Sequence, residues 1–146
     1  MYPDCDEILK MAPDYDIIPV CREIYADVIT SITLLRKLAA VSKRYYLLES
    51  VEGGEKWGRY SFLGFDPVMR VKCSCGKVTI EKDGEETEKV TDKPLEVLRE
   101  ILKDYKAPRL EGLPPFAGGF VGYFAYAMIG YAEPKLNIKK GTFNDY

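Results

Sequence analysis

Hydrophobic residues recur at helical spacing in three stretches of the chain. Asp4 and Glu7 form a capping pattern that predicts a short helix near the N-terminus. Thr30 or Ser31 can cap a second helix, whose apolar side chains follow at helical spacing as Leu34, Leu35, Leu38 and Val41. Pro94 predicts the start of a third helix. The side chains expected on its buried face are Leu95, Leu98, Ile101, Leu102 and Tyr105.

Segments rich in β-branched and aromatic residues predict strands between and after these helices. The segments span residues 17–26, 45–51, 59–64 and 118–126. Because the helices and strands do not alternate regularly, the pattern indicates an α+β fold with antiparallel sheets.

Residues 71–90 predict an antiparallel meander of further strands. Asp83-Gly84 is a strong hairpin signal, and Gly76-Lys77 fits a two-residue turn with glycine in the first position. The meander supports the antiparallel part of the fold prediction.

The composition is that of an ordinary globular domain, since 47% of the 146 residues are hydrophobic and 30% are charged. The net charge of −2 gives no field that would attract nucleic acid or an anionic membrane. The longest mostly apolar run, residues 116–128, is shorter than the roughly 20 residues that a membrane span needs. The N-terminus has no secretory signal pattern. We therefore expect a cytoplasmic chain that binds neither nucleic acid nor membrane.

The chain has no histidine and four cysteines, at positions 5, 21, 73 and 75. Their spacing fits neither a disulfide framework nor a zinc site, and Cys73 and Cys75 are expected to pack as small apolar residues on one face of a strand. Histidine is the commonest general base near neutral pH, so its absence disfavours a self-contained active site. We predict no catalytic residue, metal ligand or cofactor within the chain.

The polar pair Glu49 and Ser50 follows the apolar start of the predicted strand over residues 45–51. A bound amino acid would offer its ammonium group to Glu49, and the Ser50 hydroxyl can donate or accept a hydrogen bond beside it. Neighbouring residues of a regular strand face opposite sides, so both can line one pocket only where the strand bulges or ends. Taken by itself, the pattern favours the alternative, a strand end whose polar side chains meet water.

Two further segments have both functional and structural interpretations. Arg59 could pair with a ligand carboxylate through its planar guanidinium, or with Glu49 or another acid of the chain. The glycines and aromatics of residues 116–124 match neither a phosphate loop nor a dinucleotide fingerprint, and favour close packing of a strand on its neighbours.

Taken together, four segments closely resemble the N-terminal region of anthranilate synthase component I, the large subunit of that enzyme. They are residues 17–24 (IIPVCREI), 46–56 (YLLESVEGGEK), 58–67 (GRYSFLGFDP) and 115–124 (PFAGGFVGYF). The resemblance extends over essentially the whole chain. One departure is Ala127 after Tyr126, where the family usually has aspartate.

The resemblance implies a fold with orthogonally packed antiparallel sheets flanked by helices, half of the chorismate-utilising enzyme fold. It implies that residues 1–146 are the N-terminal regulatory domain of a subunit that converts chorismate and ammonia to anthranilate and pyruvate. The catalytic, chorismate-binding domain and its Mg²⁺ would lie in a C-terminal part that is absent here. The resemblance leaves open whether the chain alone is an enzyme, whereas the full-length subunit would be a lyase, anthranilate synthase. A glutamine amidotransferase subunit would supply the ammonia.

In that family the N-terminal domain contributes half of a feedback L-tryptophan site. Carried over by position, the resemblance makes Leu48, Glu49 and Ser50 the expected inhibitor contacts, with Arg59 and Tyr60 as weaker candidates. It also implies an apolar surface that the catalytic domain would cover, for which residues 118–128 are the candidate.

Three alternatives remain open from the sequence. The first is the large subunit of aminodeoxychorismate synthase, which shares the domain plan. The second is a free-standing amino-acid-binding module, and the third is a structural domain that binds nothing.

Overall fold

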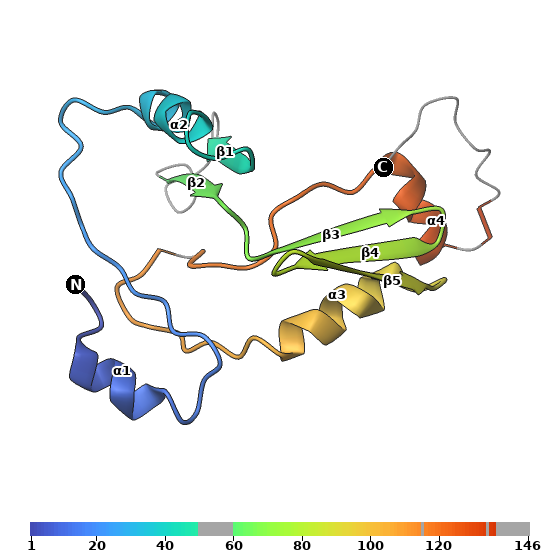
Figure 1. Cartoon of the computed structure of the whole chain (residues 1–146), viewed down its shortest axis with the longest axis horizontal. Coiled ribbons are helices and arrows are strands. Elements are labelled where there is room, and N and C mark those ends of the chain that lie inside the picture. Colours follow the sequence, from blue (N-terminus) through green and yellow to red (C-terminus); the bar gives the residue numbers. More distant parts are fainter. Residues whose placement is uncertain (50–59, 115, 134, 137–146) are drawn as a thin grey trace. The chain divides into compact units, whose positions relative to one another are not determined.

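The computed structural model describes residues 1–49, 60–114, 116–133 and 135–136 (Figure 1). In these residues it contains two small antiparallel sheets and four α-helices, which confirms the α+β prediction. The elements in order are α1 (Cys5–Met11), α2 (Ser31–Ala39), β1 (Tyr45–Glu49), β2 (Ser61–Phe65), β3 (Met69–Ser74), β4 (Lys77–Lys82), β5 (Glu85–Val90), α3 (Pro94–Lys103), a 3₁₀ turn (Tyr126–Met128) and α4 (Ile129–Ala132).

The chain divides into two compact units. One comprises residues 1–23, 71–80 and 87–146, and the other comprises residues 24–70 and 81–86. The sheet of β1 and β2 belongs to the second unit, whereas the sheet in the order β3-β4-β5 contributes residues to both. The orthogonal packing of the sheets stays a prediction.

Two tight turns produce the predicted meander. Asp83 and Gly84 have φ of 54° and 82°, the pair of positive values that a type I′ hairpin turn requires. The turn before β4 consists of Cys75 and Gly76, with φ of 50° and 78°. The predicted turn at Gly76-Lys77 is therefore wrong by one residue, because a type I′ turn places its glycine second.

The helix α3 runs beside the three-stranded sheet (Figure 1), and Lys89 Nζ of β5 lies 3.2 Å from Glu100 Oε2 of α3. The hydrophobic core of the described residues is small: Val78 of β4 is 1% exposed and Val97 of α3 is 4% exposed. Pro94 at the start of α3 is also buried. Of the predicted apolar stripe, Leu102 is exposed and the other members are half-buried.

The starts of α1 and α2 follow the predicted capping chemistry. Asp4 Oδ1 accepts from Glu7 N at 2.8 Å and Glu7 Oε2 accepts from Asp4 N at 3.0 Å, a complete capping box. Thr30 is the N-cap of α2, and its Oγ1 accepts from Thr33 N at 3.2 Å. Ser31 is thus the first helical residue, so its hydroxyl does not cap the helix.

Two predicted strands are wrong. Residues 17–26 form no strand; Cys21 makes an isolated bridge with Tyr2, and Pro19 has no N–H to donate to a ladder. Residues 118–126 are irregular up to the 3₁₀ turn, because Gly118 and Gly119 have φ of 156° and 141°, far from the negative φ of a strand. Composition favoured strands here, but no neighbouring strand pairs with either segment in the described residues.

Ser42, only 5% exposed, holds together the open end of the β1–β2 sheet. Its Oγ lies 2.5 Å from Asp66 Oδ1 and accepts from Arg44 N at 3.1 Å. Asp66 N donates to Arg44 O at 2.9 Å, and Asp66 ends β2 with a φ of 45°. These bonds satisfy the buried Ser42 hydroxyl. They lie next to the first residue of β1, Tyr45, and the last residue of β2, Phe65.

Glycine at position 64 is needed for close packing across the same sheet. Tyr46 and Gly64 are direct partners in the β1–β2 ladder. A Cβ atom added to Gly64 would lie 2.7 Å from Tyr46 Cζ and 2.8 Å from the Tyr46 hydroxyl oxygen. The tyrosine ring therefore covers the glycine backbone.

Replacing Gly64 by alanine is expected to lower the free energy of unfolding by about 1–3 kcal/mol, because the Tyr46 ring must move away from the new methyl group. Urea unfolding of the two proteins measures the difference. Gly122→Ala is the matched control, since a Cβ there meets no atom within 4 Å. Equal stability of the two variants would show that the ring moves at no cost.

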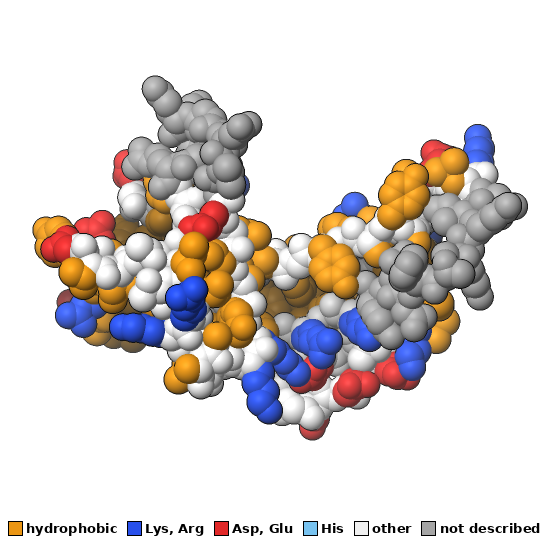
Figure 2. Space-filling view, turned by 90° about the horizontal axis from the view of Figure 1, so that it is seen from above, with side chains coloured by type: hydrophobic (Ala, Val, Ile, Leu, Met, Phe, Trp, Pro, Cys, Tyr) orange, Lys and Arg blue, Asp and Glu red, His pale blue; other side chains and the backbone are white. Residues whose placement is uncertain are grey.

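Large apolar side chains are exposed over much of the described surface, and Figure 2 shows them spread across the face in view. In the segment predicted to be an apolar surface, Tyr123, Phe124 and Tyr126 are 78%, 68% and 84% exposed. The prediction that residues 118–128 present apolar side chains to solvent is confirmed.

Candidate functional site

The candidate inhibitor segment lies on the β1–β2 sheet. The strands are antiparallel, with Leu48 opposite Phe62 and Glu49 opposite Ser61. Successive side chains of a strand alternate between faces. Leu48 and Phe62 therefore share one face of the sheet, and Glu49 and Ser61 share the other.

The Glu49 carboxylate contacts hydroxyl groups from two different elements. Ser31 Oγ, on the first residue of α2, donates to Glu49 Oε1, and Ser61 Oγ of β2 lies 3.5 Å from the same oxygen. The helix α2 packs on both β1 and β2, which brings Ser31 to a residue 18 positions later in the chain. No described residue forms an ion pair with Glu49.

The apolar part of the candidate site lies on the other face. Leu48 is half-exposed, and Tyr60 and Phe62 are half-buried with their ring centroids 6.0 Å apart. A ligand that contacts both the Leu48 side chain and the Glu49 carboxylate must lie at the end of the strands, where side chains of both faces are within reach.

The described residues include Leu48, Glu49 and Tyr60 of the five predicted contacts. Ser50 and Arg59 lie outside them, as does the single tryptophan of the chain, Trp57. Sequence reasoning did not identify Ser31 and Ser61 as neighbours of Glu49. Pairing the strands predicted over residues 45–51 and 59–64 could have indicated that Ser61 lies beside Glu49. No local pattern along the chain connects Ser31 with Glu49.

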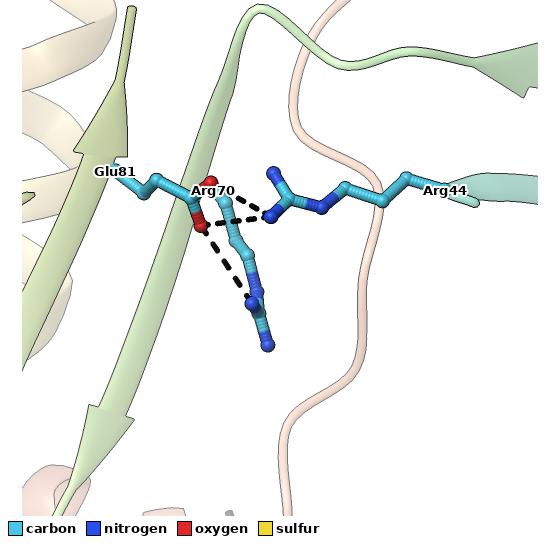
Figure 3. A network of polar contacts seen from close by, with 3 residues as sticks. All are labelled: Arg44, Arg70 and Glu81. Atoms are coloured by element: carbon cyan, nitrogen blue, oxygen red, sulfur yellow. Dashed lines mark hydrogen bonds and ion pairs between the residues drawn. The ribbon is translucent and has the colours of Figure 1, made fainter. Parts of the chain in front are cut away.

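A cluster of three charged side chains lies in the same unit (Figure 3). Arg44 Nη2 donates to both carboxylate oxygens of Glu81, at 2.7 and 3.0 Å, and Arg70 Nη1 lies 3.7 Å from Glu81 Oε2. The hydrogen bond from the Arg44 guanidinium holds the pKa of Glu81 below its ordinary value of 4.5. All three side chains are partly exposed, so the cluster is screened by solvent.

The lowered pKa of Glu81 predicts a pH dependence of folding. Because the ionised form is favoured in the folded state, its contribution is present above pH 4.5 and is lost as the pH falls through the lower, folded-state pKa. We expect the stability difference between the parent chain and Glu81→Gln to shrink over that range. Urea unfolding at successive pH values measures it, with Glu86→Gln as the control for an exposed glutamate. A difference that stays constant with pH would contradict the prediction.

No described group of three or more cysteine, aspartate, glutamate or histidine side chains could hold a metal ion. All four cysteines are free thiols. In the same part of the chain, none of the helices has the length and apolar character needed to cross a membrane.

These observations define an α+β domain whose candidate site is a carboxylate at the end of a two-stranded sheet. The chain is 44% identical over 138 residues to anthranilate synthase component 1 of Acetivibrio thermocellus, a match that covers 94% of this chain and 28% of that protein. It is 42% identical over 133 residues to the Pseudomonas aeruginosa protein of that name, covering 90% of this chain and 27% of the relative. The chain is 37% identical over 131 residues to the Aquifex aeolicus protein of that name, a match that covers 88% of this chain and 26% of the relative.

The chain is therefore homologous to a part of anthranilate synthase component 1, and the resemblance predicted from its sequence is confirmed. It spans only 26% to 28% of the length of these three relatives. No family model matches the chain, and no solved structure matches it significantly.

Proposed function

We propose that this chain is the N-terminal regulatory domain of an anthranilate synthase component 1 and that it contributes part of a feedback site for L-tryptophan. The identity of 44% over nearly the whole chain supports the family. The observation that carries the site is the Glu49 carboxylate, which two hydroxyls contact and no described cation neutralises. A primary ammonium group is the complement that such a carboxylate favours.

In this proposal substrate binding and catalysis belong to the rest of the subunit. The remaining domain would bind chorismate and Mg²⁺ and form anthranilate and pyruvate, and a second component would supply ammonia from glutamine. The relatives' name, component 1, supports the existence of such a second component. The whole assembly would work in the cytoplasm.

The ligand contacts would come from Leu48 against the indole ring, Glu49 against the ammonium group and Ser50 against a polar group, with Arg59 and Tyr60 beside them. Part of the site would come from the remaining domain. Tryptophan bound between the two would favour an arrangement of low activity, which is feedback inhibition by differential binding to two states. The chain alone should therefore bind L-tryptophan weakly.

The test uses a chimera in which this chain replaces the matching stretch of the Acetivibrio thermocellus relative. We expect the chimera to form anthranilate from chorismate and ammonia, and L-tryptophan to inhibit it. Glu49→Gln and Ser50→Ala should each weaken the inhibition at least tenfold with little change in uninhibited activity. Glu81→Gln, which removes a carboxylate elsewhere in the same unit, is the matched control.

Calorimetric titration of L-tryptophan into the same proteins separates binding from activity. Binding that neither Glu49→Gln nor Ser50→Ala changes would place the site elsewhere and overturn the proposal. Absence of L-tryptophan binding to the chimera would overturn the regulatory role.

A further inference from the structure

The Glu49 side chain is the part of the candidate site whose orientation the structure explains. Glu49 is the last described residue of β1, and its side chain is exposed. Packing in the hydrophobic core therefore does not fix its orientation. A glutamate has several rotatable bonds, and ordering such a side chain on binding costs conformational entropy when it is free to rotate beforehand. Any group that orders it in the unliganded protein therefore improves binding.

We propose that Ser31 and Ser61 are positioning residues that orient the Glu49 carboxylate toward the ammonium group of the bound amino acid. This inference rests on the proposed function, because it assumes that Glu49 meets an ammonium group. It assigns a role to α2, an element outside the segment that the sequence pattern singled out.

The geometry of the three side chains carries the inference. Both hydroxyls contact Oε1 of Glu49. Ser31 precedes Glu49 in the chain and lies at the start of α2, whereas Ser61 follows it and lies on β2, the strand paired with β1. None of the described residues forms a hydrogen bond with Oε2 or an ion pair with the carboxylate. Among the described residues, one carboxylate oxygen is thus held by two hydroxyls, while no described cation pairs with the other.

The two serines should contribute unequally. Ser31 is the closer donor, whereas the Ser61 oxygen lies 3.5 Å from Oε1, at the outer limit of a hydrogen bond. We therefore expect Ser31 to determine the orientation of the carboxylate and Ser61 to limit its movement toward β2. Because each bond acts by ordering the carboxylate before the ligand binds, its loss is expected to weaken binding roughly fivefold for Ser31 and about twofold for Ser61.

The competing explanation is structural. No acidic residue lies in the first turn of α2, so Glu49 can also serve as the anion that the positive end of this helix favours. In that case Ser31 would hold the helix on the sheet and would have no specific effect on an ammonium group. The test must therefore distinguish an oriented carboxylate from a stable helix.

The experiment measures the affinity of the chimera for two ligands by calorimetric titration. One is L-tryptophan, and the other is indole-3-propionate, which lacks the ammonium group but keeps the indole ring and the carboxylate. Ser31→Ala should weaken L-tryptophan binding roughly fivefold and leave indole-3-propionate binding unchanged within about twofold. Ser31→Thr, which retains the hydroxyl, should restore most of the affinity for L-tryptophan.

Thr30→Ala is the matched control for the helix. It removes the N-cap bond from Thr30 Oγ1 to Thr33 N and weakens the start of α2, but leaves the contact between Ser31 and Glu49 in place. We expect it to lower the thermal midpoint more than Ser31→Ala does, without discrimination between the two ligands.

Two results separate failure of the inference from failure of the proposed function. If Glu49→Gln weakens L-tryptophan binding but Ser31→Ala does not, or if Ser31→Ala weakens both ligands equally, the positioning role is wrong and the feedback site stands. If the parent chimera does not bind L-tryptophan at all, the proposed function fails first and the positioning role falls with it.

Discussion

Replacing Val78 by aspartate is expected to unfold the part of the chain built on the three-stranded sheet. Val78 is 1% exposed, and only Val97 shares its place among the buried hydrophobic residues of the described chain. A carboxylate at this position would be buried without a partner, or would have to move to solvent and disturb the packing around residue 78. Either change costs several kcal/mol, comparable with the total stability of about 5–15 kcal/mol of a typical domain.

Far-UV circular dichroism and urea unfolding measure this effect directly. Thr87→Asp is the control, because it places the same charge on β5, whose residues are all exposed. We expect it to change the free energy of unfolding by no more than about 0.5 kcal/mol. A Val78→Asp protein that unfolds cooperatively within about 1 kcal/mol of the parent chain would show that Val78 is not at the centre of the fold.

The elements that could be predicted from sequence are those in which local chemistry decides the structure. The capping box of Asp4 and Glu7 defines a helix start by itself, and Asp83-Gly84 supplies the two positive φ values of its turn. The strands predicted over residues 17–26 and 118–126 failed because a strand also needs a partner. Composition shows that a segment can pair, but not whether a partner strand lies beside it.

The candidate site was predictable to a similar degree. The pattern of residues 45–51 predicted a strand, which the structure describes up to Glu49 as β1, whereas the end of the predicted strand lies outside the described residues. The contact from Ser31 depends on how α2 packs on β1 and β2, a tertiary relation that no spacing along the chain contains. The turn at Cys75-Gly76 was missed by one residue for a local reason, since a type I′ turn places its glycine second and not first.

Replacing Tyr123, Phe124 and Tyr126 together by serine is expected to leave the stability of the isolated chain nearly unchanged but to abolish its assembly with the rest of the subunit. These side chains are 78%, 68% and 84% exposed, so folding of the chain alone buries little of their surface and loses little when they are removed. In the chimera, an apolar partner surface would cover them and each ring would contribute its burial to the interface. Urea unfolding of the isolated chain and anthranilate formation by the chimera measure the two effects.

The control must remove equally exposed apolar side chains from a different segment. Ile24, Tyr25 and Val28 are 79%, 97% and 90% exposed, and their replacement by serine should change neither the stability of the chain nor the activity of the chimera. Loss of activity in both triple variants would mean that the rest of the subunit requires a broad apolar surface. Full activity in the aromatic variant would show that residues 123–126 face solvent in the whole protein too. Exposed aromatic side chains cost solubility without stabilising the chain that carries them, so burial by another surface would account for their presence. The difference between the two triple variants shows which of the two segments such a surface covers.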